Sequence, residues 1–260
     1  MRAVLLDLDG VLYVGDRPVP GAAETVEWLC DKGIPHLFLT NTTSRPRDAI
    51  VQKLAAMDVP AAPDDVLTPP VAAHAWLARH GIRHPALFVP EATAAELSDL
   101  DPLDPAAEDG AGAVVVGDLG EGWDFPTLNR AFRLLMAADA PPLLALGLTR
   151  YWRAPDGLRL DAGAFVRALE YATGRGAVVL GKPDPSFYAA AVEALDVPPE
   201  DVLMVGDDVV TDVGGAQAAG LAGVLVRTGK YSPADLDGDV SPDAVLDSVA
   251  DLPAWWGAGD

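Results

Sequence analysis

Polar residues that could do chemistry directly follow four short apolar runs of this sequence. In chain order these residues are Asp7 and Asp9, Thr40 and Asn41, Lys182, and Asp207 and Asp208. A continuous apolar run that stops at polar residues is typical of a buried parallel strand. Ligands of open parallel sheets bind beyond the carboxyl ends of the strands. We therefore expect carboxylates, a hydroxyl group and an ammonium group to meet at one edge of a sheet.

The acidic residues of this set favour a metal site. Asp7 and Asp9 are two residues apart, a spacing that places both side chains on the same side of an extended chain. Two carboxylates this close repel each other, so one would be protonated unless a cation lies between them. Asp207 adds a third carboxylate. Hard oxygen ligands of this kind suit octahedral Mg²⁺ better than zinc or copper.

Each of these residues alone also has a structural interpretation. A lone Asp-x-Asp commonly ends a strand, Lys182 could occupy a surface turn, and Thr40 with Asn41 could cap a helix. However, Lys182 is one of only four lysines, and its charge could hold a phosphate oxygen and offset the acids. A hydroxyl and a free backbone N–H at a strand-to-helix turn also suit phosphate. The combination, more than any single residue, predicts phosphate chemistry.

The elements that must position these residues alternate between strands and helices, which predicts an α/β fold with a doubly wound parallel sheet. We expect strands of this sheet at 3–6, 36–39, 177–180, 202–205 and 223–226. The middle third of the chain has its own alternation, with strands expected at 86–89, 114–116 and 143–146. The sequence therefore predicts a core of residues 1–69 and 177–260 with an α/β domain of residues 70–176 inserted into it.

The charge balance limits the possible partners. The chain has 260 residues, and 39 acidic against 18 basic residues give a formal net charge of -21. A negative surface argues against nucleic acid and against an anionic membrane as partners, and a phosphate site on it would need a local cation. The first apolar run is too short and too acidic for a signal peptide, and no apolar stretch approaches a membrane span. We expect a cytoplasmic protein without an internal disulfide, because Cys30 is the only cysteine.

The four motifs together resemble those of the haloacid dehalogenase superfamily, in the same order. They read Asp7-Leu8-Asp9-Gly10-Val11-Leu12, Thr40-Asn41, Gly181-Lys182-Pro183, and Gly206-Asp207-Asp208 followed by Asp212. The long insert between the second and third motifs resembles the C2-type cap of the class IIA, NagD-like branch. Within that branch, the chain is most similar to the phospholysine phosphohistidine inorganic pyrophosphate phosphatase group, at residues 157–163, 168–172, 212–217 and 227–231.

The resemblance implies a magnesium-dependent phosphatase that acts on a small phosphorylated substrate through an aspartyl-phosphate intermediate. Asp7 would be its nucleophile and Asp9 its general acid and base. The presence of Asp9 argues against a dehalogenase, which manages without an acid at this position. Further roles that the resemblance implies are Mg²⁺ ligation by Asp7, the Asp9 carbonyl and Asp207, ordering of metal-bound waters or Lys182 by Asp212 and Asp208, and phosphate binding by Thr40, Asn41 and Lys182.

The cap of this family sets substrate choice, and its members often pair through their caps, which implies a possible homodimer. Arg150 and Asp161 are candidates for the cap's substrate loop, with packing or solvation as the alternative. A phosphotransferase or phosphomutase on the same fold is the nearest enzymatic alternative. A phosphoaccepting regulatory protein or a non-catalytic binding protein is the alternative of a different class, although receiver domains carry their acids in another order and lack a large cap.

Overall fold

The computed structural model describes residues 1–43, 45–154 and 156–257, and the chain divides into two compact units. The first unit contains Met1–Thr40, Arg47–Leu67 and the residues from Lys182 onward. The second contains Asn41–Pro46 and Thr68–Gly181. The chain therefore leaves the first unit after Thr40, returns at Arg47, leaves again after Leu67 and returns at Lys182. Thr40 and Lys182, two of the predicted site residues, lie at these crossings.

The first unit is built on a six-stranded sheet with the order β14-β13-β12-β1-β4-β5, and all neighbouring strands are parallel. The strands are β1 (Ala3–Asp7), β4 (His36–Leu39), β5 (Val66–Leu67), β12 (Val202–Gly206), β13 (Ala222–Val226) and β14 (Ala244–Leu246). β1 lies between β12 and β4, with Leu6 opposite Val205 and Asp7 opposite Leu39. The carboxyl ends of these three strands are therefore adjacent, which places Asp7, Thr40 and Asp207 at the same edge.

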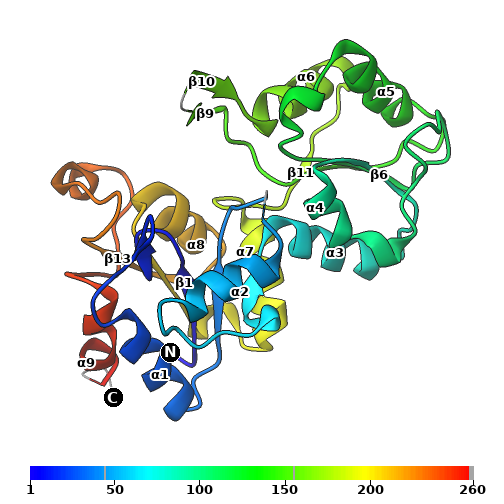
Figure 1. Cartoon of the computed structure of the whole chain (residues 1–260). Coiled ribbons are helices and arrows are strands. Elements are labelled where there is room, and N and C mark those ends of the chain that lie inside the picture. Colours follow the sequence, from blue (N-terminus) through cyan, green and yellow to red (C-terminus); the bar gives the residue numbers. More distant parts are fainter. Residues whose placement is uncertain (44, 155, 258–260) are drawn as a thin grey trace. The chain divides into compact units, whose positions relative to one another are not determined.

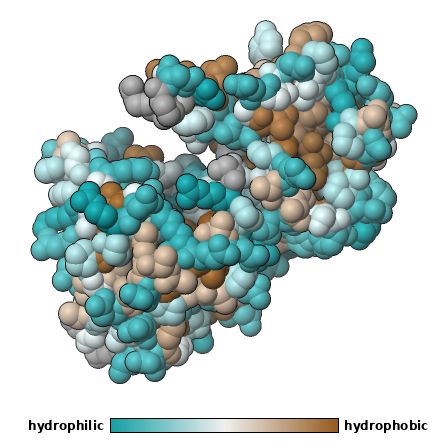
Figure 2. Space-filling view, in the orientation of Figure 1, coloured by the Kyte–Doolittle hydropathy of each residue, from teal (hydrophilic) through white to brown (hydrophobic). Residues whose placement is uncertain are grey.

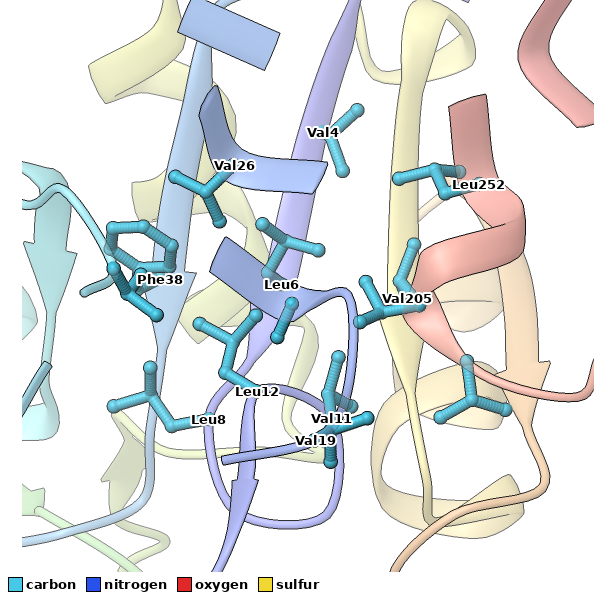
Figure 3. Packing of buried hydrophobic residues seen from close by; sticks show 14 of the residues in the cluster. Val4, Leu6, Leu8, Val11, Leu12, Val19, Val26, Phe38, Val205 and Leu252 are labelled. Atoms are coloured by element: carbon cyan, nitrogen blue, oxygen red, sulfur yellow. The ribbon is translucent and has the colours of Figure 1, made fainter. Parts of the chain in front are cut away.

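Helices pack on this sheet through apolar side chains at helical spacing. α1 (Ala22–Asp31) buries Ala22, Val26 and Leu29, which recur every three or four residues. Figure 3 shows Val26 beside Phe38 and Leu6, and Leu252 of α9 (Leu252–Gly257) beside Val205. The remaining helices of this unit, drawn in Figure 1, are α2 (Arg47–Ala55), α7 (Pro185–Leu195) and α8 (Gly215–Ala218), and a two-stranded hairpin joins β2 (Tyr13–Val14) to β3 (Arg17–Pro18).

The second unit has its own four-stranded parallel sheet with the order β11-β8-β7-β6. Its strands are β6 (Pro85–Phe88), β7 (Ala113–Val116), β8 (Leu143–Ala145) and β11 (Val178–Val179). The helices of this unit are α3 (Pro69–Arg79), α4 (Glu91–Ala95), α5 (Phe125–Leu135) and α6 (Ala162–Thr173). An antiparallel hairpin of β9 (Tyr151–Ala154) and β10 (Gly157–Leu160) precedes α6.

The predicted α/β architecture is confirmed, but one strand was assigned to the wrong sheet. Residues 177–180 were expected in the first sheet, whereas Val178 and Val179 pair with Leu144 and Ala145 of β8 in the second. A short apolar run indicates a buried parallel strand but does not specify its partner, since both sheets accept the same pattern. The edge strands β5 and β14 were not predicted, because two or three residues are too few for a periodic pattern.

The visible surface of each unit is mostly hydrophilic (Figure 2). Hydrophilic residues cover most of the face of each unit that Figure 2 presents, and hydrophobic ones are interspersed among them. Among the described residues, no helix combines the length and apolar character that crossing a bilayer requires.

Candidate active site

A buried ion-pair triad lies at the edge of the first sheet. The Nζ atom of Lys182 is 2.6 Å from Oδ1 of Asp7 and 2.8 Å from Oδ1 of Asp212. Asp7, Lys182 and Asp212 are 7%, 7% and 1% exposed. A buried charge without a partner costs several kcal/mol, so each member of the triad depends on the others. Two carboxylates share one ammonium group, and the triad is therefore negative when all three are ionised.

The surroundings shift the pKa of each triad member. Burial raises the pKa of Asp7 and of Asp212 above the ordinary aspartate value, although Lys182 opposes this shift in both. Burial alone would lower the pKa of Lys182, but the carboxylates of Asp212 and Asp7 raise it above that of a free lysine. The amine of Lys182 therefore stays protonated. Burial makes ionisation of the carboxyl groups of Asp7 and Asp212 unfavourable.

Asp207 lies in a close-fitting cradle that only glycine permits. Its Oδ2 accepts a hydrogen bond of 2.7 Å from the backbone N–H of Lys230. Gly10 and Gly229 have φ angles of +95° and +63°, and a Cβ atom at these two positions would come 2.0 Å and 2.1 Å from the same Oδ2. Both the left-handed backbone and the close approach therefore exclude a larger residue. Its Oδ1 is buried and accepts no hydrogen bond from the residues described.

The acidic residues fit a hard cation. One carboxylate oxygen from each of Asp7, Asp207 and Asp212 lies within 4.8 Å of the others. Burial raises the pKa of Asp207 as well. When Asp207 ionises at neutral pH, it adds a negative charge to a cluster of carboxylates that is already negative. An unsatisfied buried oxygen beside further carboxylates is a donor set that suits a divalent cation such as Mg²⁺.

We expect Asp207→Asn to stabilise the metal-free protein by about 1–2 kcal/mol at about pH 7.5, because it removes a buried negative charge from a cluster of carboxylates. A carboxyl with a raised folded-state pKa contributes stability at low pH and loses it as the pH rises through that pKa. The advantage of asparagine should therefore shrink at about pH 4. Urea unfolding in EDTA measures both, with Asp239→Asn, an exposed aspartate, as the control. A less stable Asp207→Asn at the higher pH would contradict this electrostatic account.

A π-helical segment, Val209–Gly214, presents Asp212 to Lys182. Oδ1 of Asp208 caps this segment by accepting hydrogen bonds from the N–H groups of Val210 and Thr211, at 3.1 Å and 2.9 Å. Oδ2 of Asp212 accepts one of 3.2 Å from the Asp208 N–H. Burial alone would raise the pKa of Asp208, but the hydrogen bonds lower it below the ordinary value. Asp208 thus stays charged and holds the turn.

Tyr188 supports the same turn from below the surface. This fully buried residue of α7 donates its hydroxyl to the carbonyls of Thr211 and Asp212, at 2.8 Å and 3.1 Å. The sequence interpretation gave Tyr188 no role. The spacing of apolar residues along a helix predicts that an aromatic side chain is buried, but it does not predict which groups its hydroxyl contacts.

The other predicted residues of the first unit are placed as follows. Thr40 is buried, and its backbone N–H donates to the Leu67 carbonyl at 3.2 Å. Asp9 is exposed and forms an isolated bridge with Tyr13, whose carbonyl accepts a hydrogen bond of 2.6 Å from the Gly10 N–H. The exposed position of Asp9 leaves its carboxylate open to solvent, unlike that of Asp7.

The remaining predicted residues belong to the second unit. Asn41 is exposed, and its Oδ1 would lie 3.3 Å from a Cβ atom built on Gly181, so its side chain is next to the turn that leads into Lys182. Arg150 is exposed, with its guanidinium carbon 5.8 Å from the centre of the Tyr151 ring. Asp161 caps α6 by accepting a hydrogen bond of 2.6 Å from the Ala162 N–H. Asp161 therefore stabilises the start of α6. The Arg150 side chain lies near the ring of Tyr151.

The segment after β13 is part of the site, although the sequence interpretation assigned it no role. Thr228 donates its hydroxyl to the Gly10 carbonyl, while Gly229 and the Lys230 N–H contact Asp207 as described above. This segment therefore contacts both the motif that contains Gly10 and the motif that contains Asp207. A glycine in a short polar stretch directly after a parallel strand is the signal that could have identified it.

Comparisons with known proteins agree with this geometry. Residues 4–101 match the family model described as haloacid dehalogenase-like hydrolase, and residues 179–252 match one described as HAD-hydrolase-like. The chain is 39% identical over 255 residues to the phospholysine phosphohistidine inorganic pyrophosphate phosphatase of Danio rerio, covering 96% of this chain and 92% of that protein.

Solved structures give the same assignment. The 4-nitrophenylphosphatase of Thermotoga maritima superimposes with a TM-score of 0.84 at 28% identity and covers 98% of this chain and 97% of its own. NagD from E. coli K-12 also gives a TM-score of 0.84, at 26% identity and with 96% and 97% covered. The chain therefore belongs to the haloacid dehalogenase-like hydrolases and is a phosphatase with the class IIA, NagD-like fold of that family.

Proposed function

We propose that this phosphatase is Mg²⁺-dependent and hydrolyses small phosphate monoesters through an aspartyl-phosphate at Asp7. The observation that carries the proposal is the placement of Asp7 between two features. Lys182 lies 2.6 Å away on one side, and Asp207, with its unsatisfied buried oxygen, follows the neighbouring strand on the other. An aspartate in this position is shielded from water and flanked by the positive charge that an incoming phosphate requires.

In this proposal Asp7, the Asp9 carbonyl and Asp207 hold the Mg²⁺ ion, which supplies charge neutralisation for the phosphoryl group. The carboxylate of Asp7 attacks phosphorus, and Lys182 stabilises the charge on the phosphoryl oxygens. Asp212 fixes Lys182 through the contact of 2.8 Å. Thr40 and the backbone of Asn41 bind the remaining phosphoryl oxygens.

Asp9 supplies the proton transfers. Its exposed carboxyl protonates the leaving oxygen and then takes a proton from the water that hydrolyses the intermediate. An acid exposed to solvent exchanges protons rapidly between these two steps. The bridge to Tyr13 fixes the backbone of the turn that carries it.

The names of the relatives suggest the substrates to compare. The similar Danio rerio protein is named for phospholysine, phosphohistidine and inorganic pyrophosphate, and the Thermotoga maritima protein for 4-nitrophenyl phosphate. We propose phosphate monoesters as the primary class, with phosphoramidates and pyrophosphate as the second. A panel of these four compounds, assayed for phosphate release with Mg²⁺ and with EDTA, tests the proposal. Hydrolysis that EDTA leaves unchanged would disprove metal dependence, and no hydrolysis of any compound would disprove the substrate class.

We expect Mg²⁺ binding to tighten as the pH rises from about 5 to 7.5, by up to about tenfold per pH unit for each proton released. The reason is that burial raises the pKa of Asp7 and Asp207, so these carboxyls must lose protons before they bind a cation. Calorimetric titration in two buffers of different ionisation enthalpy measures the released protons. Binding without proton release across this range would contradict the raised pKa values.

A further inference from the structure

The second unit contains a cavity of about 530 Å³ that shares no lining residue with the candidate active site. Its volume falls within the roughly 300–1,000 Å³ of small-molecule sites. Most of its lining residues are apolar, among them Leu87 of β6, Ala94 of α4, and Leu103 in the segment between α4 and β7. The cavity is therefore large enough for an aromatic or branched aliphatic group, and its walls suit one.

Arg130 of α5 supplies a fixed positive charge to this cavity. Its Nε donates to the Ala107 carbonyl at 2.9 Å and its Nη2 to the Asp104 carbonyl at 3.1 Å. Its guanidinium carbon lies 5.2 Å from the centre of the Phe88 ring. These contacts hold the guanidinium group in one orientation, so little side-chain entropy remains to be lost when a ligand binds.

Arg130 forms no direct ion pair with a carboxylate in the part of the chain that the structure describes, although Glu108 and Asp104 lie near enough to offset part of its charge. The two nearby acids have other partners. Oδ1 of Asp104 accepts a hydrogen bond of 2.7 Å from the Ala106 N–H, and Glu108 pairs with Arg133 at 3.6 Å. In a protein with a net charge of -21, this guanidinium group is thus a fixed cation beside an apolar cavity, and no direct ion pair with a described residue occupies it.

We propose that this cavity binds a small ligand with an apolar body and a single carboxylate, which the guanidinium group of Arg130 receives. A guanidinium presents parallel N–H groups that match a carboxylate, and a charge-assisted pair of this kind is stronger than a neutral hydrogen bond. Two acidic residues, Glu91 and Asp104, line the same cavity and oppose further negative charge. The site therefore favours a monoanion over a phosphate dianion, which separates its ligand from the substrate of the active site.

Helix α4 connects the cavity to the segment that carries Asn41. α4 contributes Glu91 and Ala94 to the lining, and its buried Thr93 donates its hydroxyl to the carbonyl of Thr43. A ligand that packs against α4 restrains this helix and, through Thr93, the residues Asn41–Thr43. If Asn41 binds the phosphoryl group as proposed above, the ligand should lower KM by pre-ordering it, so this regulatory step rests on the proposed function.

The binding step is tested by titrating 4-fluorophenylacetate into the full-length protein and following the fluorine NMR signal. We expect Arg130→Gln to weaken binding at least about tenfold and Glu91→Gln to tighten it, since the two variants remove charges of opposite sign. The neutral analogue 4-fluorophenylacetamide should bind at least about tenfold more weakly than the acid. Ala94→Phe, which places an aromatic ring in part of the cavity and leaves Arg130 in place, should weaken binding. No binding to the wild type, equal binding of the amide, or equal effects of the two charge variants would overturn the proposal.

The regulatory step has its own readout. With 4-fluorophenylacetate present, KM for 4-nitrophenyl phosphate should fall by about fivefold or more in the wild type. Thr93→Val removes the hydroxyl that reaches Thr43, so this variant should bind the probe normally but lose the KM effect. A KM change that persists in Thr93→Val or in Arg130→Gln would contradict the route through α4. A protein that binds the probe but hydrolyses no phosphate ester would disprove the proposed function and leave the cavity assignment standing.

Discussion

Asp7→Asn should lower kcat/KM for 4-nitrophenyl phosphate by at least about 10³-fold while the protein remains folded. The amide is nearly isosteric with the carboxyl but cannot attack phosphorus. The fold should tolerate the change, because burial already makes ionisation of Asp7 unfavourable and raises its pKa. Lys182 also keeps Asp212 as a partner at 2.8 Å.

Steady-state assays of purified protein, with circular dichroism to verify folding, measure this effect. Asp16→Asn is the matched control, because Asp16 is a fully exposed aspartate of the same N-terminal region. The control should retain wild-type activity. A folded Asp7→Asn protein with more than about a tenth of wild-type activity would mean that another group is the nucleophile.

Lys182→Met should destabilise the metal-free protein by about 3–5 kcal/mol at about pH 8, since it leaves two buried carboxylates without their cation. Without Lys182 the pKa values of Asp7 and Asp212 should rise further, because the group that opposed their desolvation is gone. Both carboxyls then bind protons at low pH, so the destabilisation should shrink at about pH 5.

A double-mutant cycle separates this electrostatic effect from lost packing. Adding Asp212→Asn to Lys182→Met should recover part of the lost stability, because it removes one of the unpaired carboxylates. Lys32→Met, which changes an exposed lysine, serves as the control. Urea unfolding in EDTA at both pH values gives the free energies. A loss of stability that is equal at both pH values and unaffected by Asp212→Asn would indicate a packing role for Lys182.

The site reconciles an acidic protein with an anionic substrate. The triad and Asp207 together place three carboxylates around one ammonium group, so the residues alone give this edge of the sheet a negative charge when ionised. The same excess that suits a divalent cation would repel phosphate without it. Under the proposed function we therefore expect binding of metal and binding of substrate to be linked by charge, and the -21 balance of the whole chain need not be reversed elsewhere.

The sequence placed Asp7, Lys182 and Asp207 at one edge of a sheet, and the structure brings them together there, but the sequence misassigned one strand. Asp7 and Asp207 were identifiable because each directly follows a buried strand, and such strand ends meet by the geometry of a parallel sheet. Lys182 does lie beside Asp7, as expected, but the reason given from the sequence was partly wrong. The strand before it belongs to the second sheet, and Lys182 reaches Asp7 because the chain re-enters the first unit at that residue.

The parts that could not be predicted depend on contacts between distant segments. The fit of Gly10 and Gly229 around Asp207 joins positions more than two hundred residues apart, and no periodic pattern encodes such a contact. The capping role of Asp161 could be read from its place before an apolar helix, as Asp and Ser commonly start helices. The cavity beside Arg130 arises from packing of α4, β6 and a loop, which a sequence pattern does not reveal.

The most direct test of the central claim is to trap the intermediate at Asp7. Borohydride reduces an acyl phosphate to an alcohol, so an aspartyl-phosphate is converted to homoserine. Wild-type protein that is turning over 4-nitrophenyl phosphate with Mg²⁺ is treated with borohydride and analysed by peptide mass spectrometry. The Asp9→Asn variant is treated in the same way, because this substitution should slow hydrolysis of the intermediate. We predict homoserine at position 7, absent without substrate or with EDTA. Homoserine at a different aspartate, or an unmodified Asp7 in protein that is turning over substrate, would contradict the account.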